Sequence, residues 1–503
     1  MELIYISNRS SEEGPLTLDT IPVEILHHIC TFFCDHCDPM KKSHIEYCFN
    51  YNPNKGKKDL LNLCLTSRAL CTVAQGVLFH HFSFGRHLMH SGPLAFRLVA
   101  ASFLQALSNK LHLRAVVKEL KIETNRDTRY PKILGFDSLS KASRHSARLL
   151  RTLGAEIGIR FRYHELQRRD LREAMVQLMI ALCPNVSKME IQIPRYWAFD
   201  KLTERNLLTQ SSTNQQPLSS LRTLDALVER LPTDNCRIPH ELCNMAAFGN
   251  PSEHALVAGS ASRLETLKCT LGALENATEM PRLEVLKLDV RGSYSDLKSL
   301  FTKIPKLREL IYCSSNKHGP LPIEINAALR NHRETLEVLA IHFWKVPYGD
   351  LVILDPFIDN TEFRLGLMSD FTNLKVLIVD ALRIREAGEN RSSEEPFQTI
   401  SDTIPESLEM LCVHAMDMVS QPDYQPLFEV ADRVREGRFK ALKHVLWTRK
   451  QNRSYPNGLG YLDPQHDSLK SGAYHIGPVD PETAVSLKKR YPILMTMQHN
   501  CYV

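Results

Sequence analysis

The sequence predicts an α/β protein in which short parallel strands and helices alternate, preceded by a group of helices near the N-terminus. The strands are indicated by a six-residue unit, apolar-x-x-apolar-x-apolar, that recurs ten times between residues 117 and 447. The helices are indicated by apolar residues that step by threes and fours between residues 18 and 82. A content of 43% hydrophobic and 24% charged residues is typical of folded globular protein.

The first helix is predicted in LTLDTIPVEILHHICTFF, residues 16–33. Pro22 suits a first turn, where its missing N–H needs no acceptor, and Glu24 suits the positive end of the helix. The apolar residues of this segment have the spacing of one helical stripe: Leu18, Pro22, Ile25, Leu26, Ile29, Phe32 and Phe33.

Two more helices are predicted in DLLNLCLTSRALCTVAQGVLFHHF, residues 59–82. Asp59 is the expected cap of one helix, and Thr66 or Ser67 is the expected cap of the next. A second apolar stripe consists of Leu70, Val73, Ala74, Val77 and Leu78. Three short helices cannot bury all of this apolar surface among themselves, so we expect something else to cover part of it.

The order and spacing of these residues, over residues 16–84, resemble an F-box of the fungal type. The residues that carry the resemblance are Leu18, Ile21, Pro22, Glu24, Ile25, Leu26, Ile29, Asp59, Leu60, Leu63, Leu65, Ser67, Arg68, Leu70, Ala74, Leu78 and Phe79. The resemblance implies docking onto the Skp-type adaptor of an SCF (cullin–RING) ubiquitin ligase. The docking side chains that it implies are Leu18, Pro22, Ile25, Leu26, Ile29, Leu60, Leu63 and Leu65. The alternative interpretation is an ordinary helical hairpin inside a larger domain.

A polar insertion over residues 34–58 departs from the compact pattern of that family. It contains Cys34-x-x-Cys37, then His44 and Cys48, four side chains that could hold Zn²⁺ tetrahedrally. The second pair lacks the spacing of a zinc knuckle, and Cys34 could simply end the first helix. A polar loop without metal is the favoured interpretation, and no cofactor is predicted.

A linking helix is expected over residues 91–112, and the repeats follow over residues 113–449. The ten units are VKELKI (117–122), VSKMEI (186–191), LRTLDA (221–226), LETLKC (264–269), LEVLKL (283–288), LRELIY (307–312), LEVLAI (336–341), LKVLIV (374–379), LEMLCV (408–413) and LKHVLW (442–447). In each unit the last three positions alternate inward and outward as in a short strand. Returning helices are predicted over residues 166–182, 295–304, 325–331 and 426–437.

Each unit leaves one apolar face bare, and stacking of units covers it, which predicts a curved array with a parallel sheet on one side and helices on the other. This region resembles divergent leucine-rich repeats. The Asn or Cys that usually follows the third apolar position is missing, so no asparagine ladder is expected; those positions hold Gly272, Arg291, Ser315, Trp344 and Leu382. The alternative is an irregular α/β domain with Leu-rich strands.

Four polar or terminal segments are expected to lie outside the stacked units. Three of them are rich in turn formers and are expected to be surface loops: residues 199–217, 232–254 and 383–398. Such loops either determine binding specificity or are solvated connections without a binding role. Residues 450–503, with a short helix candidate at 482–490, are expected to cap the last repeat.

Charge and hydropathy exclude several classes of function. A net charge of +5 over this length is too weak to indicate a nucleic-acid partner. The longest nearly apolar stretch, residues 174–183, is too short to span a membrane, and the N-terminus lacks a secretory signal. We therefore expect a cytoplasmic or nuclear location, with reduced cysteines.

The most charged region, residues 144–173, is rich in arginine. Guanidinium groups bind phosphate and carboxylate well, so one interpretation is a patch for an acidic partner. The other, which we favour, is the solvated face of two helices. The arginines of the possible patch are Arg160, Arg162, Arg168 and Arg169.

The sequence contains no phosphate-binding loop and no hydrolase or zinc-protease motif. We therefore predict a non-catalytic subunit: a substrate-recognition adaptor whose repeats hold a protein target, of unknown identity, near the ligase. In that scheme the protein contributes to catalysis only by holding the target near the ligase. The alternative functions are a leucine-rich-repeat scaffold with no ubiquitin role and, less favoured, an α/β hydrolase or transferase with unrecognised motifs.

Overall fold

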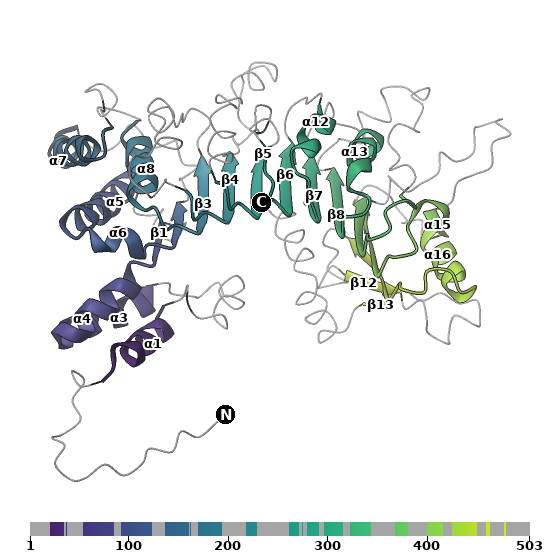
Figure 1. Ribbon diagram of the computed structural model, residues 1–503, viewed down its shortest axis with the longest axis horizontal. Coiled ribbons are helices and arrows are strands. Elements are labelled where there is room, and N and C mark those ends of the chain that lie inside the picture. Colours follow the sequence, from purple (N-terminus) through teal and green to yellow (C-terminus); the bar gives the residue numbers. More distant parts are fainter. Residues whose placement is uncertain are drawn as a thin grey trace, which may run out of the picture. The chain divides into compact units, whose positions relative to one another are not determined.

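The computed structural model contains two compact units, each combining helices with parallel strands (Figure 1). The first consists of Met1–Gln192 and Phe199–Leu221, and the second of Ile193–Ala198 and Arg222–Val503. The α/β class and the parallel strands predicted from the sequence are confirmed. The structure describes residues 21–34, 37, 54–84, 92–122, 136–159, 161, 170–193, 218–228, 261–270, 274, 279–290, 296–314, 322–343, 368–380, 400–415, 425–449, 459–462 and 477–478.

Three helices open the described part of the first unit: α1 (Val23–Phe32), α3 (Asn54–Thr66) and α4 (Arg68–Leu78). Helix α1 begins directly after Pro22, whose carbonyl accepts the N–H of Leu26 at 3.1 Å. The Ser67 side chain caps α4 by accepting the N–H of Leu70 at 3.1 Å, so one of its two predicted caps is confirmed. Both helix starts follow from local sequence.

Helix α3 begins earlier than predicted. Its first residues, 54–58, belong to the span that was expected to be insertion, and Asp59 lies inside the helix instead of capping it. The predicted cap at Asp59 is therefore wrong. Asn54 to Lys58 form a further helical turn because none of these residues breaks a helix at its first turn, where even Gly56 is tolerated.

The three helices share a core made of the apolar stripe on each helix. Its buried members are Leu26, Cys30, Cys34, Leu60, Leu70, Val73, Ala74 and Val77. Four of these come from α4, which contacts both α1 and α3. The predicted stripe on α4 is thus the one around which the other two helices pack.

The rest of the first unit holds four helices and three strands among the described residues. The helices are α5 (Gly92–Asn109), α6 (His112–Val116), α7 (Phe136–Glu156) and α8 (Asp170–Leu182). Helices α5, α7 and α8 contact one another. The strands are β1 (His81–Phe84), β2 (Glu119–Ile122) and β3 (Lys188–Ile193), and neighbours in this order pair in parallel.

Strand β1 was not predicted. It belongs to the sequence FHHFSF, residues 79–84, which has the apolar-x-x-apolar-x-apolar pattern of the repeat unit. The F-box resemblance assigns these residues to the end of the helical group instead. Because β1 pairs with β2 in parallel, the strand array begins before residue 113, the start that was expected. The α4 helix therefore runs directly into the first strand.

The second unit is a succession of parallel strands with short helices between them. The parallel strands are β4 (Thr223–Val228), β5 (Thr266–Thr270), β6 (Val285–Val290), β7 (Glu309–Ser314), β8 (Val338–Phe343), β9 (Val376–Asp380), β10 (Met410–Ala415) and β11 (His444–Arg449). Each pairs with the next in chain order. Figure 1 shows β4 to β8 side by side and pointing the same way. All ten predicted units are strands.

The described helices of this unit are α12 (Leu297–Thr302), α13 (Pro322–Leu329), the 3₁₀ turn η5 (Arg330–His332), α15 (Ile400–Thr403) and α16 (Gln425–Arg435). Three of them match predicted helices. Two strands follow β11 within the segment expected to cap the array: β12 (Leu459–Leu462) pairs antiparallel with β11, and β13 (Gly477–Pro478) pairs antiparallel with β12. The predicted excursions and the helix candidate at 482–490 lie outside the described residues.

Candidate partner-binding surfaces

The predicted docking residues divide into buried and exposed side chains. Leu26 and Leu60 are each only 2% exposed, inside the three-helix core. Their assignment as direct contacts of a partner is therefore corrected: they are core residues. The sequence could not separate the two roles, because a stripe that packs on neighbouring helices and one that packs on a partner use the same side chains.

The other predicted docking residues differ in exposure. Ile25 and Leu65 are 52% and 85% exposed, Pro22 is also exposed, and Ile29 and Leu63 are half-buried. Leu18 lies outside the described residues. Three of the eight predicted side chains, those of Pro22, Ile25 and Leu65, therefore lie on the surface of the helical group.

Large apolar side chains that were not predicted extend this surface. Phe32 is 60% exposed and lies seven residues, two helical turns, from Ile25 on α1. On α3, Leu61 is four residues from Leu65, and both are exposed. Each of the two helices thus carries an exposed apolar pair beside its buried stripe, and such exposure is unusual unless a partner covers it.

The two cysteines of the candidate zinc motif lie beside a histidine from elsewhere in the chain. The side-chain donor atoms of Cys34, Cys37 and His80 lie within 4.8 Å of one another. His44 and Cys48, the other predicted ligands, lie outside the described residues. Sequence spacing does not point to His80 as a ligand, because it is 43 residues from Cys37 and only the fold brings the two together.

The four arginines of the possible acidic-partner patch, Arg160, Arg162, Arg168 and Arg169, lie outside the described residues. Nearby on α7, Arg148 and Arg151 are exposed. Helix α7 is also tied to α6 by an ion pair of 3.1 Å between Arg114 and Glu156. The patch stays a prediction.

In the second unit, strands β4–β6 present a polar face. Burial along β6 alternates residue by residue, with the leucines inside and the intervening residues half-exposed. Across the strands, Asp225, Lys268 and Lys287 are register neighbours. Lys268 Nζ lies 3.1 Å from a carboxylate oxygen of Asp225, whereas burial and the nearby charge of Lys268 lower the pKa of Lys287.

Strands β7–β11 are buried on both faces. The residues that alternate with their leucines form a cluster of their own: Ile311, Ala340, Val376, Ile378, Met410, Cys412 and Leu446. At the border of this cluster, burial raises the pKa of the Glu309 carboxyl. The apolar character of this second face excludes it as an open, solvated binding surface.

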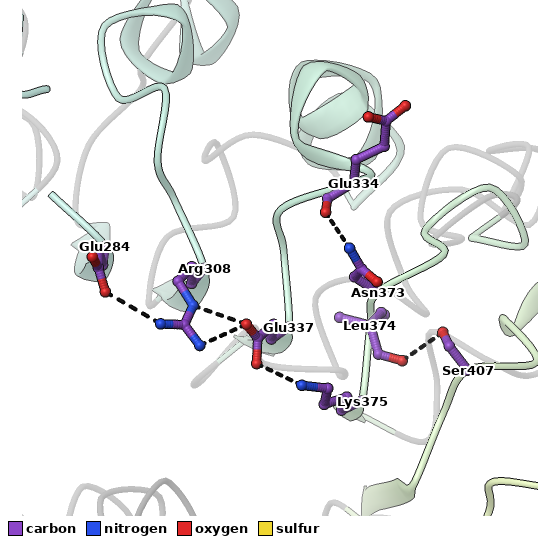
Figure 2. A network of polar contacts seen from close by, with 8 residues as sticks. All are labelled: Glu284, Arg308, Glu334, Glu337, Asn373, Leu374, Lys375 and Ser407. Carbon is purple, nitrogen blue, oxygen red and sulfur yellow. Dashed lines mark hydrogen bonds and ion pairs between the residues drawn. The ribbon is translucent and has the colours of Figure 1, made fainter. Parts of the chain in front are cut away.

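A ladder of charged side chains runs across the turns that precede the strands (Figure 2). Arg308 contacts Glu284 at 3.4 Å on one side and Glu337 at 2.6 Å on the other, and Glu337 in turn accepts a hydrogen bond from Lys375 at 2.9 Å. The hydrogen bond from Lys375 and that from Arg308 lower the pKa of Glu337. Similar pairs join Arg222 to Glu265 and Glu409 to Lys443.

Every residue of this ladder occupies the second position of its repeat unit, and the backbone carbonyls of the residues before Lys443 are used in the same way. The carbonyl of Glu337, for example, accepts the N–H groups of Lys375 at 2.9 Å and Val376 at 3.1 Å. In the first unit the carbonyl of Lys118 accepts from Ser187 and Lys188 in the same manner. Main-chain groups of the turns are therefore paired without an asparagine ladder.

Further side-chain contacts fasten individual turns. The Asn373 amide donates to the Glu334 carbonyl, and the Ser407 hydroxyl donates to the Leu374 carbonyl at 2.9 Å (Figure 2). These contacts join the turn before β9 to the turns on either side of it.

A scan against protein-family models and a search of curated proteins found no match to this chain. No helix among the described residues is both long enough and apolar enough to cross a membrane.

Proposed function

We propose that this protein is a substrate-recognition adaptor of an SCF-type ubiquitin ligase, with the N-terminal helices as an F-box that docks on a Skp-type adaptor. The observation that carries the proposal is the exposure of Ile25, Phe32, Leu61 and Leu65 beside a filled helical core. A hairpin that only packed inside a larger domain would not leave such side chains exposed on two helices.

The proposed docking surface differs from the one that the F-box resemblance implies. Leu26 and Leu60 hold the helices together, and the exposed side chains of α1 and α3 make the contact. An interface of this kind draws most of its affinity from a few desolvated apolar anchors. Ile25 and Leu65 are the predicted docking residues best placed to be such anchors.

The strand array supports the second half of the proposal, a divergent leucine-rich-repeat solenoid that holds the target. The ten repeats of this pattern form parallel strands, and within each compact unit the second-position carbonyl of one repeat accepts N–H groups from the following repeat. Such stacking of near-identical supersecondary units is what gives repeat proteins an extended binding surface. The chain would contribute proximity between a target lysine and the charged E2 enzyme.

The part of the array best suited to a target is the polar face of β4–β6. Asp225, Lys268 and Lys287 are half-exposed there, whereas the equivalent face of β7–β11 is already buried. Charges of both signs on a half-desolvated surface favour a partner with complementary charges.

Co-purification with a Skp-type adaptor tests the proposal. Ile25→Asp together with Leu65→Asp places two charges on the exposed apolar surface and is expected to reduce co-purification at least tenfold, while circular dichroism stays unchanged. The matched control is Leu111→Asp, an exposed leucine in the first unit that lies just before α6, outside the three-helix group. Pro22→Ala with Leu26→Ala, by contrast, should also loosen the helical core.

A scaffold with no ubiquitin role is the second candidate. It is favoured if the wild-type chain fails to retain the adaptor, or if the Ile25/Leu65 variant retains it as well as the Leu111 variant does.

A further inference from the structure

A turn at the end of α1 brings two thiols together. The Cys34 N–H donates to the Thr31 carbonyl at 3.1 Å, which continues the last turn of the helix. The Cys37 N–H then donates to the Cys34 carbonyl at 3.0 Å. This closed turn holds the ends of the Cys-x-x-Cys segment together, so that both side chains face the same space. Cys34 is buried in the three-helix core and Cys37 is half-buried.

A histidine from the junction of α4 and β1 completes the group. His80 Nδ1 lies 3.5 Å from Cys37 Sγ, and all three donor atoms lie within 4.8 Å of one another. The His80 backbone is fixed on both sides, because its N–H donates to the Val77 carbonyl and its carbonyl accepts the N–H groups of Lys118 and Glu119. The backbone position of His80 is thus fixed where β1 begins to pair with β2.

We propose that Cys34, Cys37 and His80 bind a zinc ion through two thiolates and one imidazole nitrogen. Tetrahedral zinc at bond lengths of about 2.3 Å to sulfur and about 2.0 Å to nitrogen requires donor atoms roughly 3.5–3.8 Å apart. The 3.5 Å between Cys37 and His80 has that separation before any metal is bound. Thiolate and imidazole donors in tetrahedral geometry select zinc over magnesium or calcium.

Binding is balanced by the loss of one proton from each thiol to solvent, so the affinity falls as the pH is lowered. The remaining coordination position belongs to water or to a further donor. The His27 ring, whose centroid is 6.0 Å from that of His80, is near the group but is not one of its three members. The ion would fasten the end of α1 to the α4–β1 junction, in addition to the apolar packing of α1 on α4.

The sequence offered Cys34 and Cys37 as possible zinc ligands together with His44 and Cys48, which lie outside the described residues. The structure adds His80 to the two cysteines. The proposal does not depend on the ligase role, because the zinc content of the purified chain is measured without any partner protein.

The test measures zinc per chain by mass spectrometry of the metal, on the full-length protein purified and dialysed under reducing conditions. Wild type is expected to hold about one zinc per chain. Cys37→Ser and His80→Ala should each hold at least tenfold less. The matched control is Cys71→Ser, a half-buried thiol on α4 of the same helical group, which should retain the full amount.

A second variant separates loss of a ligand from loss of folding. His80→Cys replaces imidazole with another zinc donor and should retain the metal, whereas His80→Ala should not. Cobalt added to the metal-free wild type should give the thiolate-to-metal absorption of a tetrahedral site, and Cys37→Ser should weaken it. A wild type that takes up neither metal, or Cys37→Ser and His80→Ala variants with unchanged zinc, would overturn the proposal.

Discussion

Strands β4–β6 and β7–β11 follow one repeat pattern but differ on the face that alternates with the leucines. A single register row crosses all eight strands. It reads Asp225, Lys268 and Lys287 in the first group and continues as Ile311, Ala340, Ile378, Cys412 and Leu446 in the second. The first three are half-exposed, and the other five are buried. The row changes from charged to apolar between β6 and β7.

The sequences of the two kinds of strand differ in a way that reports how many of their faces are covered. A strand with one solvated face alternates apolar and polar residues, whereas a parallel strand covered on both faces is a continuous apolar run. Strand β6, VLKLDV, is of the first kind, and β9, VLIVD, is of the second. The solvated face of the first group is the one open to the proposed target, whereas the equivalent face of the second group is part of the core.

The largest effect is expected from shortening a side chain in the apolar half of the row. Ile378→Ala should lower the free energy of unfolding by about 2–5 kcal/mol, because it leaves a cavity between packed side chains. Lys268→Ala, at the same register in β5, should cost less than about 1 kcal/mol, because it removes only a half-exposed ion pair. Urea unfolding of both variants measures the two changes in the free energy of unfolding. Equal decreases would contradict the distinction between the two groups of strands.

An intermediate effect is expected at His332, which lies in the turn before β8. Its ring is buried, Nε2–H donates to the Phe301 carbonyl at 3.0 Å, and burial lowers its pKa despite that hydrogen bond. His332→Ala should therefore cost about 1–3 kcal/mol, because it leaves a cavity at a buried ring and removes one of the two hydrogen bonds to the Phe301 carbonyl, which keeps the Ile304 N–H at 3.0 Å.

The pH dependence has a definite sign. Because the folded-state pKa of His332 is below the unfolded value of about 6.5, the unfolded state binds more protons, and stability falls as the pH drops below about 6.5. His332→Gln should reduce this slope in thermal unfolding between about pH 7.5 and 5.5. An unchanged slope would show that other groups cause it.

The smallest effect is expected from the charged ladder, which both groups of strands share. Glu337→Gln removes the ion pairs with Arg308 and Lys375 and should cost about 0.2–1 kcal/mol, less at high salt, because the two cationic partners are about half exposed to solvent. The control Glu334→Gln leaves intact the backbone carbonyl that Asn373 contacts and should be neutral.

The contribution of Glu337 should also depend on pH. Its folded-state pKa is lowered, so its stabilisation is present above the unfolded value of about 4.3 and is lost as the pH falls through the folded value. A Glu337→Gln variant as salt-sensitive and acid-sensitive as wild type would show that the backbone hydrogen bonds alone connect the turns.

Much of the strand array could be predicted because each unit carries its own signal. A Leu-x-x-Leu-x-Leu segment specifies a strand and the buried face of that strand, whatever lies elsewhere in the chain. The unit at residues 79–84 carries the same signal, with phenylalanine in place of leucine, and could have been found by the same search. The charged ladder was also present in the sequence, at the second position of the units.

The residues of the proposed docking surface and of the proposed zinc site show where sequence reasoning stops. Leu26 and Leu65 have the same side chain and both match the helical pattern, yet one is core and the other is surface. That outcome depends on how three helices turn toward one another, which apolar spacing alone leaves open. His80 joins Cys37 only because α4 ends beside the turn that follows α1.

Local sequence is sufficient to predict the α/β class, the position of ten strands and the stripe that builds the helical core. These features are local, because they depend on which residues alternate within a few positions of one another. Packing between distant segments determines which leucines remain exposed, which strands are covered on both faces and which histidine lies beside the two thiols. Those outcomes depend on contacts between residues far apart in the chain, and they exist only once the chain has packed.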